Sequence, residues 1–378
     1  MFKKFVKRIS TLLFFILSFL ILCAWGSTGH HIISLNATKA FTGKAQTLSF
    51  ISLFIIAHAS DADYRKDKDP TEGPKHFIDI DSYQEFVKTG KISQNYDTVV
   101  ALHGSNFVIE QGILPWAIIN TFDSLETAFK RNDWNAAEVF AADLGHYVGD
   151  SHQPLHLTSN YDGQKTGQSG VHSRYETTMI GQYSSQITYN VDSVVVIPNV
   201  ANYVFNYIYE NYKYKDSILF ADKEATNFAG SISSTAYLPK FWELTGGFTT
   251  LLMKNASDRL ANLIYTAWVE AGAPIPNSTG VKPFNNDKPL RFKLGQNYPN
   301  PFNPSTSIKY QVPKTSFVSL KVYDNSGKEV AILINEKQEA GEHIAQFIVS
   351  GRKFASGIYY YRLNTADYVD VKKMILLK

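Results

Sequence analysis

The spacing of apolar residues changes once along this chain of 378 residues, near residue 275. Before that point, apolar residues recur every three or four positions, which is the period of an amphipathic helix, and few strand patterns intervene. The helical stretches lie near residues 30–42, 46–60, 106–131, 133–152, 197–212, 216–232 and 249–271. Segments 61–82 and 157–171 are rich in Asp, Gly, Pro and Asn, and we predict that they are loops. The pattern therefore predicts a mainly α-helical domain over residues 25–275.

Beyond a linker at residues 276–291, which contains Pro, Gly and Asn, the apolar period becomes two. Four segments then alternate like half-buried strands, and turn residues at 325–327 and 340–341 separate some of them. The segments are 307–312, 318–323, 343–348 and 358–363. We predict a small all-β sandwich over residues 292–378.

The first 24 residues have the composition of a secretory signal peptide. Basic residues precede an apolar run at 12–22, and Ala24 offers a small residue for cleavage; the basic residues are Lys3, Lys4, Lys7 and Arg8. The run is short for a transmembrane helix. Cys23 is the only cysteine and raises a lipoprotein alternative, but Leu22 stands where a small residue is normally needed. A mature chain without cysteine relies on its core and on bound metal instead of disulfides.

Net charge excludes little: at +3 it is too small to indicate a nucleic-acid or membrane partner by itself. The candidate chemistry is concentrated at residues 146–156. His146 and Asp150 are four apart and share one helix face, while Pro154 ends that helix and lets His156 approach from another direction. Converging imidazole and carboxylate groups suit a divalent metal such as zinc. The alternative, a buried helix with hydrogen-bonded histidines, explains one such pair better than it explains so many donors.

Further donors lie on both sides of this segment. His172 and Glu176 are again four apart, so a second helix can present both on one face. The other candidates are Trp25 at the start of the mature chain, His30, Asp61, Asp63 and His76. Together the donors make about three sets, more than one zinc needs.

The β module resembles the C-terminal sorting domain of the bacterial type IX secretion system. The resemblance is carried by residues 294–304, 322–328, 357–360 and 372–378. It implies export across an outer membrane, interaction with the type IX machinery, and a secreted or cell-surface location, with the module removed or used for attachment. A carbohydrate-binding sandwich is the alternative, and no motif in the module favours it.

From Trp25 to about Ala273 the chain resembles the superfamily that joins zinc-dependent phospholipase C to the single-strand-specific zinc nucleases of fungi and plants. The donor motifs appear in the same order, and the resemblance implies three Zn²⁺ ions. One would be held by Asp63, His76, His146 and Asp150. A second would be held by the amine and carbonyl of Trp25, with His30 and the bridging Asp150; the third would be held by His156, His172 and Glu176. Asp61 fits less well than Asp63, and packing, solvent or outer positions are expected for His31, His58, His103 and His152.

The implied reaction is hydrolysis of a phosphate ester, best suited to a diester. A water between two zinc ions, held through Asp150 and Asp63, becomes acidic enough to attack phosphorus. The third zinc offsets charge on the departing alkoxide, so no protein nucleophile is needed.

The substrate signals conflict. For a nuclease, Phe77 would stack on a base, worth ~1–3 kcal/mol, Asp79 would bond the base edge, and Arg65 would help hold phosphate. Glu176 as last ligand, the short segment 157–171 and a cation–π face on Tyr64 favour phospholipase C. Thr28, however, stands where choline-binding phospholipases carry a glutamate. We predict a nuclease for single-stranded nucleic acid, with phospholipase C as the alternative. A non-catalytic secreted zinc-binding or adhesive surface protein is the alternative of another class.

Overall fold

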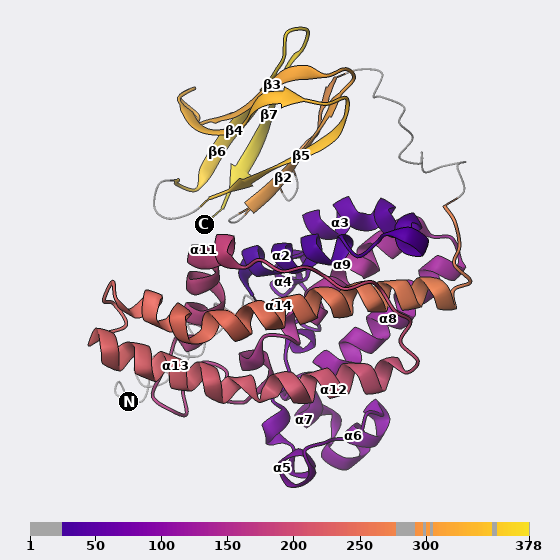
Figure 1. The fold of residues 1–378 in the computed structure, drawn as a ribbon, viewed down its shortest axis with the longest axis vertical. Helices are drawn as coiled ribbons and strands as arrows, with labels where there is room; N and C mark the ends of the chain where they lie inside the picture. Colours follow the sequence, from indigo (N-terminus) through magenta and orange to yellow (C-terminus); the bar gives the residue numbers. More distant parts are fainter. Residues whose placement is uncertain (1–24, 277–291, 298–299, 303–304, 350–353, 378) are drawn as a thin grey trace, which may run out of the picture. The chain divides into compact units, whose positions relative to one another are not determined.

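The computed structural model describes residues 25–377 apart from 277–291, 298–299, 303–304 and 350–353, and it divides into two compact units, Met1–Pro276 and Asn277–Lys378 (Figure 1). The predicted signal peptide and all of the predicted linker after Pro276 lie outside the described residues. Among the helices that are described, none is long and apolar enough to cross a membrane.

The first unit is mainly α-helical, as predicted. Its longer helices are α2 (Gly26–Thr38), α8 (Leu114–Lys130), α9 (Trp134–Asp150), α12 (Val200–Tyr212), α13 (Tyr214–Ala229) and α14 (Tyr237–Glu270). Shorter helices are α3 (Ser52–Ala57), α4 (Asp61–Arg65), α5 (Gln84–Thr89), α6 (Tyr96–His103), α7 (Ser105–Glu110), α10 (Val171–Ser173) and α11 (Ile180–Tyr183). The 3₁₀ turns are η1 (Gly43–Ile51), η2 (Gly73–His76), η3 (Ile80–Ser82), η4 (Pro154–Leu157) and η6 (Ser184–Gln186), and η5 (Arg174–Met179) is a π-helix.

Helix α9 occupies the middle of this unit, where it packs against α2, α3, α8 and α14. It begins where the side chain of Asp133 accepts a hydrogen bond from the amide of Ala136, which caps the helix. Its second half is buried on all sides, from Leu144 to Asp150. The helix ends four residues before Pro154, which cannot continue it. His146 and Asp150 therefore lie on a rigid, buried segment.

The helices differ from the prediction in several places. Segment 61–82 is not a plain loop, because it contains α4 and two 3₁₀ turns. The stretch 106–131 is split into α7 and α8, since Gly112 has a φ of 85° and Pro115 starts the second helix. Helix α14 begins twelve residues before position 249, at Tyr237. Gly246 and Gly247 have low helix propensity, but the packing of α14 against α2 and α13 outweighs it.

The second unit is the predicted β-sandwich. Its sheets have the strand orders β1-β2-β5 and β4-β3-β6-β7, with antiparallel pairing, and both contribute to one apolar core that includes Tyr310, Leu320 and Tyr361. The strands are β1 (Lys293–Leu294), β2 (Ser305–Val312), β3 (Ser316–Tyr323), β4 (Glu329–Gln338), β5 (Gly341–Ile348), β6 (Gly357–Asn364) and β7 (Val369–Leu376). The sequence pattern missed β1, β4 and β7. Strand β4 has no fully buried residue, so alternation is weak there.

Candidate metal centre

Eight of the nine predicted ligands converge in the first unit, in three groups. Within each group, the donor atoms lie within 4.8 Å of one another. The groups are His30, His146 and Asp150; Asp63, His76 and His146; and His156, His172 and Glu176. Helices α2, α4 and α9, the turns η2 and η4, α10 and η5 supply these side chains. Segments far apart in the sequence therefore meet around the end of α9.

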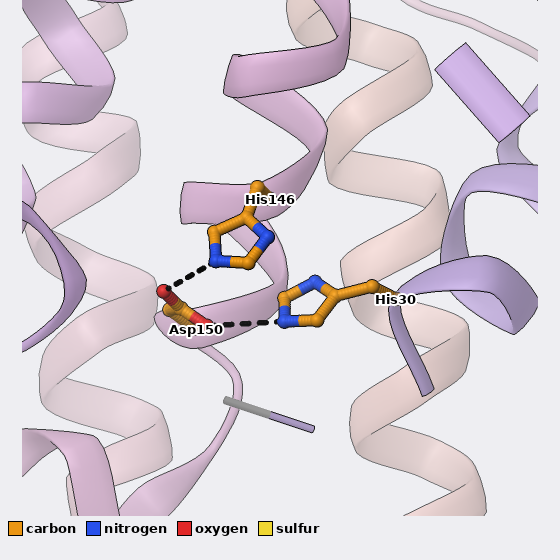
Figure 2. A group of neighbouring side chains, drawn as sticks. All are labelled: His30, His146 and Asp150. Carbon is orange, nitrogen blue, oxygen red and sulfur yellow. Dashed lines mark ion pairs between the residues drawn. The ribbon is translucent and has the colours of Figure 1, made fainter. Parts of the chain in front are cut away.

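Asp150 forms ion pairs with two imidazoles, those of His30 and His146, as Figure 2 shows. Its Oδ1 is 3.3 Å from Nε2 of His30, and its Oδ2 is 3.4 Å from Nε2 of His146. The two rings stack on each other with centroids 3.9 Å apart. All three side chains are fully buried. One carboxylate thus presents a separate oxygen to each histidine.

The second group shares His146 with the first. Nδ1 of His76 lies 3.0 Å from Nε2 of His146 and 2.9 Å from Oδ2 of Asp150, and Oδ1 of Asp63 lies 3.5 Å from that same nitrogen of His146. On its other side, the His146 ring donates from Nδ1 to the carbonyl of Ala59 at 2.9 Å. This bond turns Nε2 toward the other donors. The first two groups therefore form one five-residue cluster of His30, Asp63, His76, His146 and Asp150.

The third group is built in the same way. Nε2 of His156 and Nε2 of His172 are 3.1 Å apart, and Oε2 of Glu176 lies 3.4 Å from the former and 2.9 Å from the latter. Each ring donates from Nδ1 to a main-chain carbonyl, that of His76 at 2.6 Å and that of Tyr161 at 3.1 Å. Both Nε2 atoms are therefore left with lone pairs directed at the same point. Glu176 belongs to the π-helix η5, a distortion that is frequent at functional sites.

Charge in both clusters is strongly coupled. Burial alone would raise the pKa of Asp150, but the neighbouring imidazoles of His146, His30 and His76 lower it well below its usual value. Burial opposes a charge on His146, yet the carboxylates of Asp150 and Asp63 raise its pKa to about 10. Burial likewise would raise the pKa of Glu176, but His172 and His156 lower it to about 2. These buried carboxylates remain ionised only because cations compensate them.

The donor set fits zinc. Several buried atoms in the clusters make no hydrogen bond within the described structure: both ring nitrogens of His30, Oδ1 of Asp150 and Oε1 of Glu176. Buried polar atoms nearly always have a partner, so atoms without one that face each other indicate a ligand site. All are nitrogen or carboxylate oxygen, which zinc prefers in the absence of thiolate.

Trp25, the ninth predicted ligand, is fully buried beside the cluster. Its indole Nε1 donates to the carbonyl of Gly149 at 2.7 Å, one residue before Asp150. Its own carbonyl accepts from the amide of Gly29 at 3.0 Å, at the start of α2. The structure thus places Trp25 next to the residues with which it was predicted to share a metal, while its ligand role remains a prediction.

The predicted substrate residues have different surroundings. Nη2 of Arg65 lies 3.1 Å from Glu72 and 2.9 Å from Asp143, so its guanidinium forms ion pairs with two carboxylates. Tyr64 is half-buried on α4, directly after Asp63. Phe77 and Asp79 are also half-buried, on the segment that follows His76.

Two charged residues that the sequence analysis passed over lie at the cluster. Nζ of Lys66 is 2.6 Å from Oδ1 of Asp63. Glu72 is 1% exposed and faces His76. Hydrogen bonds from Lys75 and Tyr147, together with the neighbouring His76 and Arg65, outweigh burial and lower the pKa of Glu72 below its usual value. Each lies three or four residues from a predicted ligand, a spacing that makes two side chains neighbours on a helix. Because segment 61–82 was predicted to be a loop, this spacing was not used.

Residues 296–377 match the family model of the secretion system C-terminal sorting domain. The match confirms the prediction for the second unit, which is a sorting domain of the type IX secretion system. The protein is therefore exported by this route to the cell surface or the extracellular space.

Other comparisons are weaker. A stretch of 96 residues is 31% identical to a probable serine protease of Bradyrhizobium tropiciagri, and it spans 21% of this chain but only 12% of that protein. Alpha-toxin from Clostridium absonum gives a TM-score of 0.39 at 12% identity, covering 93% of this chain and 95% of the toxin. Alpha-toxin from an avian strain of Clostridium perfringens gives 0.42 at 11% identity, covering 92% and 91%.

Proposed function

We propose that the helical unit is a zinc-dependent phosphodiesterase that hydrolyses P–O ester bonds outside the cell. The observation that carries the proposal is the five-residue cluster in which His146 belongs to two donor groups at once, while Asp150 of the first group lies 2.9 Å from His76 of the second. A third group, with its own histidines and carboxylate, stands beside it. Three groups of nitrogen and oxygen donors suit three zinc ions. A single structural zinc would need only one of them.

Bound zinc would supply an acidified water and positive charge for a phosphate ester. The chain's own part is to hold the donors and to place a cation for the substrate. Lys66 is the better candidate for this cation, because its ammonium already lies against Asp63. Arg65 is better explained as a structural residue that joins Glu72 to Asp143. We therefore prefer Lys66 to Arg65, whose predicted role in holding phosphate stays a prediction.

Single-stranded nucleic acid is the substrate we favour, because of the segment after His76. The carbonyl of Phe77 accepts from the amide of Leu114 at 3.2 Å, and the amide of Asp79 donates to Gln111 at 2.7 Å. Burial and the charge of Asp81 raise the pKa of Asp79 to about 7. A carboxyl group that is partly protonated at neutral pH can both donate to and accept from the edge of a base. An aromatic residue on the same anchored backbone segment as such a group supports base binding.

Phospholipid is the alternative substrate. Tyr64 directly follows the candidate ligand Asp63 and is half-buried, and an aromatic ring is the type of group that binds a cationic headgroup. A phospholipase C would hydrolyse a P–O ester bond in a phospholipid instead of one in a nucleic acid.

One experiment distinguishes the three candidate functions, which are a nuclease, a phospholipase C and a non-catalytic zinc-binding or adhesive protein. The chain from Trp25 onward is purified, its zinc content is measured, and it is assayed on single-stranded DNA, single-stranded RNA and phosphatidylcholine vesicles side by side. Chelation should abolish turnover, and zinc should restore it. Turnover of vesicles alone would establish the phospholipase. A zinc-loaded protein that cleaves none of these substrates would support a non-catalytic zinc-binding or adhesive protein.

A further inference from the structure

The two nitrogens of the His76 ring have different surroundings. Nδ1 points into the cluster, 2.9 Å from Oδ2 of Asp150 and 3.0 Å from Nε2 of His146. Nε2 points the other way and makes no hydrogen bond in the part of the chain that the structure describes. The carboxylate that faces it is Glu72, whose Oε1 lies 3.6 Å away.

Glu72 is held from several directions. Its Oε1 accepts from the hydroxyl of Tyr147 and from Nη2 of Arg65 at 3.1 Å, and its Oε2 accepts from Nζ of Lys75 at 2.8 Å. Arg65 is itself anchored by Asp143. With 1% of its surface exposed, the carboxylate has little room to move. Tyr147 directly follows His146 on α9, so this network is built onto the same helix as the cluster.

The backbone also fixes the spacing between Glu72 and His76. The turn η2 places them four residues apart on one side, and the carbonyl of Glu72 accepts from the amide of Lys75 at 3.0 Å. The carbonyl of Pro74, in the same turn, accepts from the amide of Ile113 at 2.7 Å, just before α8. A shift of Glu72 away from His76 would break these contacts.

A neutral imidazole has one N–H and one lone pair. If Nδ1 of His76 uses its lone pair for a metal, the proton must be on Nε2. The carboxylate of Glu72 faces that nitrogen and can accept its hydrogen bond. Such a hydrogen bond fixes the tautomer and the ring orientation, and it makes the ring a stronger donor to metal.

We propose that Glu72 is a positioning residue of the metal centre, which holds His76 with its proton on Nε2 and its Nδ1 toward Asp150 and His146. The inference rests on the proposed function in one respect, because it takes His76 as a metal ligand. Glu72 itself does not touch the metal or the substrate; it acts through His76.

The test compares Glu72→Gln and Glu72→Ala with Glu85→Gln. The last variant is a matched control, because Glu85 forms a similar pair with His103, 2.6 Å apart and away from the clusters. Zinc affinity is measured by competition with a chelator, and melting is measured without metal to confirm folding. We expect Glu72→Ala to bind one zinc about 10–100-fold more weakly. Glu72→Gln should lose less, since its amide oxygen can still accept from Nε2, and Glu85→Gln should match the wild type.

Wild-type affinity in a folded Glu72→Ala protein would overturn the proposal. If the wild-type chain itself binds no zinc, the proposed function fails before any variant is compared. A second measurement needs no variant: NMR of zinc-loaded wild-type protein with ¹⁵N-labelled histidine. His76 should carry its proton on Nε2, and a proton on Nδ1 would refute the role of Glu72.

Discussion

The ring of His156 donates a hydrogen bond from Nδ1 to the main-chain carbonyl of His76 at 2.6 Å. The amide of Ile78 returns a bond to the carbonyl of His156 at 2.8 Å. These two bonds join the third donor group to the segment that carries the second. The same segment continues into Phe77 and Asp79, so the candidate metal centre and the candidate base site share one short stretch of backbone. Substitutions at one of these sites are therefore expected to be felt at the other.

Asp150→Asn should remove most of the metal from the five-residue cluster. An amide offers only one oxygen and no charge, whereas Asp150 faces His30 with one oxygen and His146 with the other. Bound zinc should fall from three ions toward one, because the group around Glu176 keeps its donors, and turnover should drop by at least about 100-fold. Zinc per chain and initial rates check this.

Asp258→Asn is the control for that variant, since Asp258 is largely buried on α14 and pairs with Lys254 outside the clusters. Equal zinc content in the Asp150 and Asp258 variants would contradict the shared role of Asp150.

Lys66→Gln should mainly reduce turnover, whereas Arg65→Gln should mainly reduce stability. Lys66 contacts Asp63 at the cluster, so its loss should reduce turnover of phosphodiesters while leaving the melting temperature nearly unchanged. Loss of Arg65 leaves Glu72 and Asp143 without a shared cation and should cost about 2 kcal/mol of unfolding free energy. Rates and denaturant unfolding of both proteins are compared. A rate loss confined to Arg65→Gln would restore Arg65 as the phosphate-binding residue.

The different contacts of these neighbouring cations show what the sequence could and could not predict. His146, Asp150, His172 and Glu176 could be grouped from spacing, because i,i+4 pairs on a helix share a face whatever the tertiary structure. Arg65 and Lys66 are adjacent, and only the course of α4 decides which one faces Asp63. Glu72 was hidden for the same reason, since a segment rich in Gly, Pro and Asp does not show in advance which of its side chains is buried.

Asp79→Asn tests the raised pKa by its effect on stability. In the folded chain the pKa is about 7, against an ordinary value of 3.8. Between these values the folded state binds more protons than the unfolded state, so stability falls as pH rises through this window. An Asn side chain does not titrate, so the variant lacks this loss of stability. Relative to wild type, the metal-free variant should therefore gain stability at about pH 8 compared with about pH 4. Denaturant unfolding at both values checks the sign, and a difference independent of pH would show that Asp79 has an ordinary pKa.

Phe77→Ala tests the choice of substrate. Stacking stabilises only a substrate that has a base, by ~1–3 kcal/mol, so cleavage of single-stranded nucleic acid should fall about 5–150-fold. Hydrolysis of a small generic phosphodiester should change much less. Phe228→Ala, an exposed aromatic on α13, is the control. Equal losses on both substrates would argue against the nuclease, and a selective loss of phospholipid turnover in Tyr64→Ala would favour phospholipase C.

The last prediction concerns the start of the mature chain. Trp25 is anchored to Gly149, one residue before Asp150, and it leads into α2, which carries His30. If its α-amine is a zinc ligand, removal of the preceding residues also activates the enzyme, because a peptide nitrogen shares its lone pair with the carbonyl and is a poor donor. A mature chain with one extra residue before Trp25 should therefore fold, keep the other zinc ions and lose most of its activity.

His30→Ala should deplete the same zinc ion, so it provides the comparison. Zinc per chain, melting temperature and turnover are measured for both variants and for the chain that begins at Trp25. The two variants should each lack about one zinc of the expected three, while the group of His156, His172 and Glu176 keeps its own. Full activity in the extended chain would refute the N-terminal ligand. Trp25 would then serve only as a core aromatic, packed against Tyr175 with ring centroids 5.7 Å apart.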